Sequence, residues 1–309
     1  MTGGAGYIGS HFCKLASRKY DLVVLDDLSN GHEEFVRWCP LEKMDIRDTR
    51  RVQALLSVFR PQAVVHFAGK ILVPESVEKP DLYQSVNVEG TKSLLTAMKN
   101  VGVPQILFSS TAAVYGIPKV VPIPESHERK PVNPYGENKR DVEDILMLGA
   151  EKIGLEVGVL RYFNVAGESP DGDLWEDHTP ETHVVPNLLR AIRERRPFFL
   201  HGTDYPTRDG TCVRDYVDVM DLANAHLVAL EKLGRMPFIS NVGSGAGVSV
   251  RELLRAAETV TGEAIQVTEG PRRAGDPPEL VADAKFFKTW YAEGLTPLEQ
   301  SLRRVWERF

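Results

Sequence analysis

The sequence has little cysteine, no long apolar run and no excess of positive charge among its 309 residues. Its three cysteines, Cys13, Cys39 and Cys212, are odd in number and far apart in the chain, which favours free thiols in a reducing cytoplasm. We find no membrane-length apolar run and no signal peptide, so we expect a cytoplasmic protein without a membrane partner. A net charge of -6 argues against a nucleic-acid partner.

The eight histidines are scattered without the spacing of metal ligands, so we expect no metal site. The sequence also lacks repeats and low-complexity linkers. Its 42% hydrophobic and 26% charged residues are ordinary for a globular protein. The length allows two domains, or one domain that carries an added lobe.

A glycine-rich stretch opens the chain, with Gly3, Gly6 and Gly9 at regular spacing before a segment that can be helical. Such a loop lets the backbone approach a pyrophosphate, and the N-terminus of the helix supplies free N–H groups there. The spacing alone is equally compatible with a surface turn, because the chain has 25 glycines.

An acidic residue follows at the distance that a dinucleotide site needs. Residues 22–25 form a short apolar run that predicts a buried parallel strand, and the run ends in Asp26. A carboxylate about 20 residues after the glycine loop binds the adenosine ribose of NAD. No arginine follows closely to accept a 2′-phosphate, which favours NAD over NADP. The alternative role for Asp26 is to cap a turn.

Strand and helix patterns then alternate. We expect strands at 41–44, 63–67, 105–108 and 156–160, and helices at 49–59, 82–99 and 135–152. This alternation predicts an α/β fold with a doubly wound parallel sheet. Asp45, Gly69 and Ser109 to Thr111 lie at the predicted carboxyl ends of strands, where such sheets bind ligands.

Tyr135 and Lys139 are four residues apart at the start of a predicted helix, so their side chains share one helix face. A nearby ammonium group lowers the pKa of a phenol and makes it a usable proton acceptor. Such a pair also arises by chance, and Tyr115 with Lys119 is a second example. Pro118 argues against a helix at that second pair. Thr111 adds a hydroxyl at a strand end, although a capping role fits a lone threonine equally well.

The character of the chain changes after residue 165. Residues 166–181 are polar and rich in Gly, Pro and Asp, which indicates a loop and a domain border. We therefore expect a first domain at 1–165 and a smaller α/β lobe at 166–309 that is interleaved with it. The lobe's predicted helices cover 184–195, 219–232 and 249–261, and its predicted strands cover 213–217 and 238–241. Arg214 and Arg273 lie in glycine-containing loops, where arginine often binds a substrate phosphate.

Together these motifs resemble those of the extended short-chain dehydrogenases/reductases, and among them the UDP-glucose 4-epimerase family. The resemblance covers nearly the whole chain and is carried by residues 2–9, 66–69, 109–116, 135–139, 161–164, 204–216 and 272–276. The long segment 204–216 is specific to the epimerase group, whereas the first motifs mark only the superfamily.

The resemblance implies a Rossmann-like domain with NAD as cofactor and a UDP-sugar as substrate. Tyr135 would be the catalytic base, Lys139 would tune it, and Thr111 would bind the sugar 4-hydroxyl. The implied cofactor-binding residues are Gly3, Gly6, Tyr7, Ile8, Gly9, Asp26, Asn30, Asp45, Ile46, Phe67, Ala68, Gly69, Asn87, Ser109, Tyr135, Lys139, Tyr162 and Phe163. The implied substrate-binding residues are Thr111, Tyr135, Asn164, Arg214, Arg273 and Asp276.

The implied reaction is 4-epimerisation of UDP-glucose and UDP-galactose through a transient 4-keto sugar. A homodimer joined through the helices at 82–99 and 135–152 is also implied. Two alternatives remain: a nucleotide-sugar 4,6-dehydratase and a non-catalytic NAD-binding protein of the same fold. A dehydratase needs an acid and a base after Thr111, where this chain has Ala112 and Ala113. Leu280 leaves the acceptance of N-acetylated sugars open.

Only Met1 and Thr2 precede the glycine loop, where this fold has a buried central strand. The sequence leaves open a start a few residues upstream; if the chain begins at Met1, we expect weaker NAD retention and lower stability than in a version extended by about five apolar residues.

Overall fold

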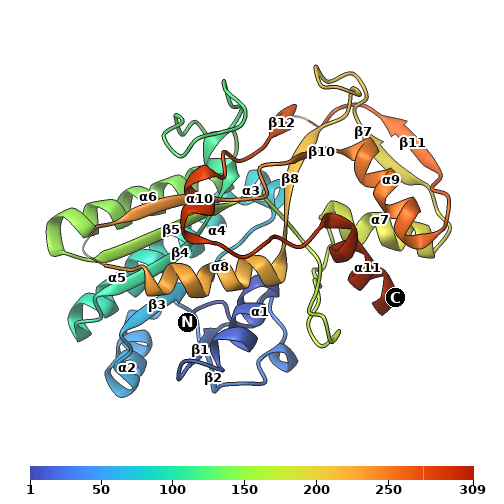
Figure 1. Ribbon diagram of the computed structural model, residues 1–309. Coiled ribbons are helices and arrows are strands. Elements are labelled where there is room, and N and C mark those ends of the chain that lie inside the picture. Colours follow the sequence, from blue (N-terminus) through green and yellow to red (C-terminus); the bar gives the residue numbers. More distant parts are fainter. Residues whose placement is uncertain (235, 274) are drawn as a thin grey trace. The chain divides into compact units, whose positions relative to one another are not determined.

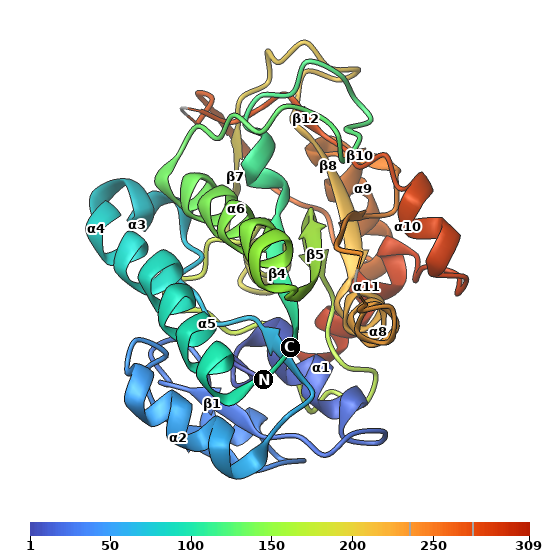
Figure 2. The same ribbon diagram turned by 90° about the vertical axis from the view of Figure 1, so that its left-hand side faces the viewer.

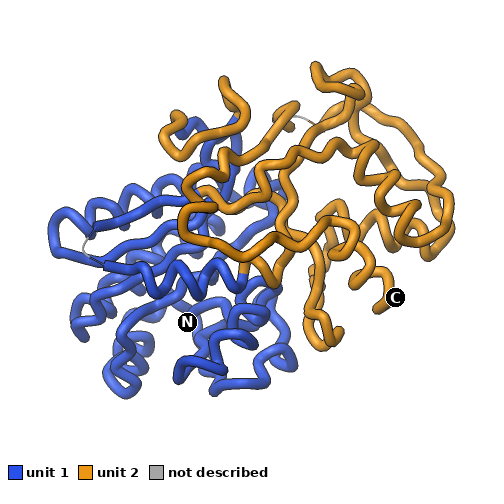
Figure 3. Tube along the Cα trace, in the orientation of Figure 1, with its two compact units in different colours: residues 1–116, 129–161, 223–240 blue, residues 117–128, 162–222, 241–309 orange. Residues whose placement is uncertain are grey.

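The computed structural model describes residues 1–234, 236–273 and 275–309. The chain forms two compact units (Figure 3). Unit 1 contains Met1–Gly116, Arg129–Arg161 and Ala223–Ser240, and unit 2 contains Ile117–Glu128, Tyr162–Leu222 and Asn241–Phe309. The sequence places the border at 165/166, whereas the main change of unit lies at 161/162, and two further segments interleave the units.

Strands and helices alternate along unit 1 (Figure 1). Its strands are β1 (Val24–Asp26), β2 (Leu41–Lys43), β3 (Ala63–His66), β4 (Gln105–Thr111) and β5 (Glu156–Tyr162), of which the last residue belongs to unit 2. Its helices are α1 (Tyr7–Ala16), η1 (Glu33–Phe35), α2 (Thr49–Phe59), α3 (Val73–Glu78), α4 (Pro80–Tyr83), η2 (Gln84–Glu89), α5 (Gly90–Val101), η3 (Ala112–Tyr115) and α6 (Pro134–Ile153). Most of α8 (Val219–Glu231) and the start of β9 (Phe238–Val242) complete it.

A parallel sheet forms the centre of unit 1. Strands follow one another in the order β3-β4-β5-β9, and β1 pairs with β2 in parallel. Thr2 joins these two groups, because it forms parallel bridges to both Leu25 and His66. Met1 and Thr2 therefore occupy the place of the first central strand, and the order matches that of a doubly wound Rossmann sheet. The predicted fold class is confirmed.

Helices cover both faces of this sheet, with α5 and α6 on one face and α8 on the other (Figure 2). Local signals define α6: Asn133 accepts a hydrogen bond from the Gly136 N–H at 2.8 Å, Pro134 occupies the first turn, and Gly154 ends the helix. Apolar side chains of α2, α5 and α6 pack against the strands in one buried cluster that includes Leu56, Leu94 and Leu146. Burial of these side chains stabilises the unit.

The helix predicted over 82–99 is not a single regular α-helix. A π-helical segment, η2, separates α4 from α5, while the backbone at both junctions stays in the right-handed helical region. π-helical turns are frequent at functional sites. This one carries the buried side chain of Asn87, and the periodicity of the sequence did not indicate it.

Unit 2 contains small sheets and a helical layer. Its strands are β6 (Asn164–Ala166), β7 (Phe198–His201), β8 (Val213–Asp218), β10 (Gly247–Ser249), β11 (Val267–Gly270) and β12 (Glu279–Leu280). Its helices are α7 (Val184–Arg193), α9 (Val250–Thr261), α10 (Lys285–Trp290), α11 (Leu298–Arg308) and the first turn of α8. β8 is central, since β10, β12 and β6 all pair with it. Helices α7, α9 and α11 share one buried apolar cluster. Within the described residues, we find no helix that is long and apolar enough to span a membrane.

Candidate active site

The predicted glycine loop joins Thr2 to helix α1, and two of its glycines are required by close contacts. A Cβ at Gly3 would lie 2.4 Å from the Ala68 nitrogen, and a Cβ at Gly9 would lie 2.1 Å from the Gly3 oxygen. Gly6 differs, because a Cβ there would meet only the Gly3 oxygen, at 3.6 Å. Gly6 is the N-cap of α1 and offers no side-chain oxygen to the first N–H groups. The open space before this helix terminus fits the pyrophosphate of a dinucleotide.

Asp26 at the end of β1 supports this loop. Its Oδ2 accepts a hydrogen bond from the Ala5 N–H at 3.0 Å, and its Oδ1 accepts one from the Leu28 N–H at 2.9 Å. Burial raises the pKa of this carboxyl group, and the backbone N–H donors oppose that rise. The turn-capping role left open by the sequence is therefore present. Each carboxylate oxygen keeps a lone pair for a further donor such as a ribose hydroxyl.

Most of the other implied cofactor-binding residues follow β2 and β3, at the carboxyl ends of these strands. Asn87 holds the backbone of Lys70 at both its N–H and its C=O, at 2.7 and 3.0 Å. The Lys70 Nζ in turn donates to Asn30 Oδ1 at 2.7 Å. The remaining members of this group are Asp45, which pairs with Arg47, the buried Ile46, Phe67, Ala68 and Gly69. The Phe67 ring lies against the rings of Phe12 and His226 in tilted contacts.

Tyr7 and Ile8 form the first turn of α1. The ring of Tyr7 meets that of His11 edge-on, with ring centroids 5.3 Å apart. Tyr7 and Ile8 therefore lie in the helix terminus that directly follows Gly6, and their contact with a cofactor stays a prediction.

Thr111, Tyr135 and Lys139 meet where β4 ends and α6 begins. Lys139 is buried, and its Nζ donates to the Ser109 carbonyl oxygen at 2.8 Å. The same Nζ lies 4.8 Å from the Phe108 ring centroid and 5.9 Å from the Tyr135 ring centroid. The Thr111 hydroxyl lies beside the Tyr135 phenol and influences its pKa. It also caps η3, because it accepts a hydrogen bond from the Ala113 N–H at 3.1 Å. The capping role considered for Thr111 is therefore present, while its role at the sugar hydroxyl stays a prediction.

Burial controls the protonation of this group. It raises the pKa of Tyr135 to about 12, while the Thr111 hydrogen bond lowers it. Burial also lowers the pKa of Lys139 to about 8, and the negative charge of Glu143 opposes that change. The Lys139 ammonium lies 5.9 Å from the Tyr135 ring centroid, a distance at which its charge interacts only weakly with the phenol.

The second Tyr/Lys pair has a different environment. Tyr115 lies buried in η3 and accepts a hydrogen bond from Arg161 Nη1 at 2.9 Å. Lys119 is exposed and pairs with Glu128 at 3.0 Å. The two residues share no helix, as Pro118 predicted.

A buried ion pair that the sequence did not reveal lies beneath this site. Glu143 and Arg161 are both buried, and the two Glu143 oxygens accept from Arg161 at 2.9 and 2.6 Å. Ser110 donates to Glu143 at 2.5 Å and Arg129 at 3.1 Å. These bonds tie α6 to β4 and β5. The only sequence signal was that Glu143 follows Lys139 by four residues on one helix face.

The predicted substrate residues of unit 2 gather around β8. Arg214 donates to the carbonyl oxygens of Val213 and Pro277 at 2.9 and 3.0 Å, and its Nη2 lies 3.6 Å from Asp276 Oδ1. Leu280 pairs with Arg214 in the parallel register of β12 and β8. Arg273 is exposed. Burial lowers the pKa of His201, and the nearby charge of Arg273 lowers it further. The neighbouring Ala274 of the motif 272–276 lies outside the described residues.

Other residues of unit 2 complete the comparison with the sequence. Asn164 begins β6 opposite Tyr216 of β8. Tyr162 is buried and Phe163 is partly exposed. Arg272, which is not among the implied substrate-binding residues, lies over the Tyr205 ring at 4.4 Å from its centroid and pairs with Asp204 at 2.7 Å. Arg214 therefore pairs with Asp276, whereas Arg272 contacts Asp204 and Tyr205 in the loop that precedes β8.

Comparisons with known proteins agree with this geometry. Residues 1–243 match the NAD dependent epimerase/dehydratase family. The chain is 48% identical over 287 residues to a UDP-glucose 4-epimerase of Rhizobium meliloti (strain 1021), covering 92% of this chain and 88% of that protein.

Solved structures are also similar. A UDP-glucose 4-epimerase from Brucella ovis in complex with NAD has a TM-score of 0.94 and 41% identity, covering 100% of this chain and 97% of that one. One from Stenotrophomonas maltophila, with bound NAD and formylated UDP-arabinopyranose, has a TM-score of 0.95 and 35% identity over 99% and 96% of the two chains. The glycine loop, the Tyr135 site and these matches together show that the chain belongs to the NAD dependent epimerase/dehydratase family.

Proposed function

We propose that this protein interconverts UDP-glucose and UDP-galactose by NAD-dependent epimerisation at C4 of the sugar. The observation that carries this proposal is the convergence of Thr111, Tyr135 and the buried Lys139 where β4 ends and α6 begins, with Lys139 Nζ held by the Ser109 carbonyl oxygen at 2.8 Å. This arrangement would bring a proton acceptor and a hydroxyl together at the end of a Rossmann strand. The similar proteins named UDP-glucose 4-epimerase supply the substrate class.

The residues at the glycine loop fit NAD. The N–H groups at the start of α1 would hold the pyrophosphate, and Asp26 would accept the adenosine ribose hydroxyls. When bound, NAD⁺ takes up the hydrogen from C4 of the sugar with its electron pair and later returns it to the opposite face. Lys139, fixed by the Ser109 carbonyl, would hold the nicotinamide ribose.

Tyr135 is assigned the proton transfer. Its phenol oxygen would accept the proton of the sugar 4-hydroxyl as C4 becomes a carbonyl carbon, and it would return that proton when the alcohol re-forms. Thr111 would hold the same sugar oxygen through its hydroxyl. The positive charge of Lys139, whose Nζ lies 5.9 Å from the Tyr135 ring centroid, would favour the phenolate by Coulomb attraction. Ala112 and Ala113 carry no group for the additional proton transfers of a dehydratase.

Unit 2 is assigned the UDP part of the substrate. Arg214 and Arg273 would bind the diphosphate, while Asp276 and Asn164 would accept or donate hydrogen bonds to the nucleoside. The keto sugar must turn over between the two transfers, so the binding free energy has to come from the nucleotide and not from the sugar.

The decisive experiment supplies purified protein with UDP-galactose, without added NAD, and measures UDP-glucose. Product formation is expected from the unmodified chain, whereas Tyr135→Phe should lose at least a hundredfold in kcat. Tyr20→Phe is the matched control, because that phenol lies at the surface with Glu231, and it should keep full activity. Tyr135→Phe with unmodified turnover would contradict the assignment of the base. A 4-keto-6-deoxy sugar as product would identify a dehydratase.

We also infer a homodimer that uses helices α5 and α6. Leu148 and Ile153 support this inference, because these large apolar side chains of α6 are 48% and 56% exposed. Light scattering should give twice the chain mass of 34.4 kDa, and Leu148→Glu should reduce it. A monomeric unmodified chain would contradict the dimer.

A reducing cytoplasmic location is the last part of the proposal. It is supported by Cys13, Cys39 and Cys212, which are all free thiols. Fractionation of cells that express the chain should recover it with cytoplasmic markers.

A further inference from the structure

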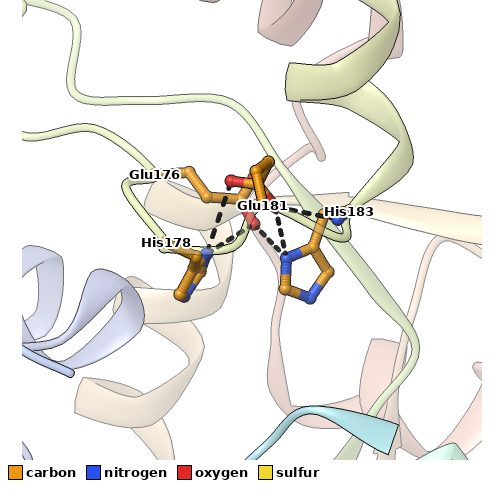
Figure 4. A group of neighbouring side chains, drawn as sticks. All are labelled: Glu176, His178, Glu181 and His183. Atoms are coloured by element: carbon orange, nitrogen blue, oxygen red, sulfur yellow. Dashed lines mark hydrogen bonds and ion pairs between the residues drawn. The ribbon is translucent and has the colours of Figure 1, made fainter. Parts of the chain in front are cut away.

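Four side chains with metal-binding atoms converge in unit 2, in the connection between β6 and α7. They are Glu176, His178, Glu181 and His183 (Figure 4). One ligand atom from each lies within 4.8 Å of those of the other three. The group is separate from the residues assigned to NAD or UDP-sugar, and the scattered spacing of histidines in the sequence did not reveal it.

Imidazole nitrogens and carboxylate oxygens alternate around this group. His183 Nδ1 lies 2.8 Å from Glu176 Oε1 and 3.1 Å from Glu181 Oε1. His178 Nδ1 lies 3.5 Å from Glu176 Oε1 and 3.6 Å from Glu181 Oε2. Around a tetrahedral Zn²⁺ with ligands at about 2.0–2.1 Å, neighbouring ligand atoms are about 3.3 Å apart. The four observed separations bracket that value, so small side-chain rotations would complete a metal-binding geometry.

Three of the four side chains are largely buried, which distinguishes this group from a cluster of acidic residues at the surface. The side chains of Glu176, His178 and Glu181 are 7%, 9% and 3% exposed. Glu181 Oε2 is buried and accepts no hydrogen bond from the residues that the structure describes, and its ion-pair contact with His178 Nδ1 is long, at 3.6 Å. A buried carboxylate oxygen without a donor is costly, and a cation would supply its missing partner. His183 is 40% exposed and leaves a path for an ion to enter.

We propose that Glu176, His178, Glu181 and His183 bind one divalent transition-metal ion, with Zn²⁺ the best match. Two carboxylates balance the charge of a divalent ion, and two imidazoles favour zinc over magnesium or calcium. Four protein ligands complete a tetrahedral shell, as in structural zinc sites. The ion therefore fixes the connection 167–183 onto the start of α7 and takes no part in the epimerisation.

The backbone around the group is already organised for this role. The Asn187 amide in the first turn of α7 donates to the carbonyl oxygens of both Glu181 and His183, at 3.1 and 2.9 Å. The His183 N–H also donates to Glu181 Oε1 at 2.8 Å. These bonds hold two ligands in place from behind, as surrounding hydrogen bonds do in known metal sites.

The test measures zinc binding by the full-length protein, purified without a metal-affinity tag and treated with chelator. Titration with Zn²⁺ alone, followed by calorimetry, should give one tight site per chain, and zinc should raise the melting temperature. Substitution of Co²⁺ should produce the intense visible absorption of a four-coordinate ion.

Two variants locate the site. Glu181→Gln and His183→Asn should each weaken zinc affinity at least tenfold and abolish the zinc-dependent rise in melting temperature. His127→Ala and Glu128→Gln are matched controls elsewhere in unit 2, and both should keep the tight site. His183→Asn is the safer variant for folding, because His183 is the most exposed member.

Two results would overturn the proposal: no zinc binding by the unmodified chain, or equal binding by the unmodified chain and His183→Asn with both folded by circular dichroism. The four residues would then form only an ion-paired clamp between His183 and the two carboxylates. Epimerase activity without zinc leaves the proposed function intact, so the two conclusions fail separately.

Discussion

Lys139 Nζ donates a hydrogen bond to the backbone oxygen of Ser109 at 2.8 Å. This contact ties the first turns of α6 to the end of β4, where Thr111 meets the phenol of Tyr135. The buried ammonium of Lys139 thus connects the end of β4 with α6, the helix that carries the predicted base Tyr135. The predictions below test this arrangement and its supports.

The epimerase rate should fall as the pH rises through about 8, the pKa to which burial lowers Lys139. Above that value the side chain loses its proton, and with it the positive charge that favours the phenolate. Arginine stays protonated throughout this range, so Lys139→Arg should be slower but should lack this alkaline decline. Initial rates from neutral to alkaline pH measure both effects. A decline shared by the two proteins would contradict the role of Lys139.

Glu143→Gln should destabilise the fold by about 3–5 kcal/mol, because it leaves the Arg161 charge buried without its partner. Replacement of both residues by methionine should recover part of this loss. Denaturant unfolding measures the free energies. Glu137→Gln on the exposed face of α6 serves as control and should change stability by less than about 0.5 kcal/mol. An equal decrease in the free energy of unfolding in the Glu137 and Glu143 variants would show that the buried ion pair does not stabilise the fold.

Gly6→Ala should separate cofactor binding from folding. A methyl group there contacts only the Gly3 oxygen at 3.6 Å, so the melting temperature of the NAD-free protein should not change. The methyl group enters the space before α1, and NAD affinity should fall at least tenfold. Gly9→Ala should lower both quantities, because its Cβ would lie 2.1 Å from the Gly3 oxygen. Unchanged NAD affinity in Gly6→Ala would place the pyrophosphate elsewhere.

Cys13 and Cys39 should form a disulfide when the protein is treated with diamide. Their sulfur atoms lie 3.0 Å apart, and the hydrogen bond from Cys13 lowers the pKa of the Cys39 thiol. A lowered pKa increases the fraction of reactive thiolate. Mass spectrometry of the intact chain should show the loss of two hydrogens. Cys39→Ser should prevent this change and Cys212→Ser should not. The same loss in Cys39→Ser would assign the oxidation to another pair.

The sequence by itself determined the features that depend on neighbours along the chain. The helix predicted at 49–59 coincides with α2 (Thr49–Phe59), and Pro134 and Gly154 delimit α6 within two residues of its predicted ends. Strand ends such as Asp26 and Thr111 lie where the alternation of strands and helices predicted them. Hydrophobic period, capping residues and glycine spacing are local properties, so they can be recognised without coordinates.

Only the tertiary structure decided which distant residues meet. The strand β12 exists through its pairing with β8, and two residues carry no periodicity of their own. Glu143 and Arg161 meet because α6 packs on β5, and Cys13 meets Cys39 across 26 positions of the chain. The Glu176–His183 group forms where a loop without regular structure closes before α7. Contacts of this kind depend on how whole elements pack, and no local pattern in the chain encodes that packing.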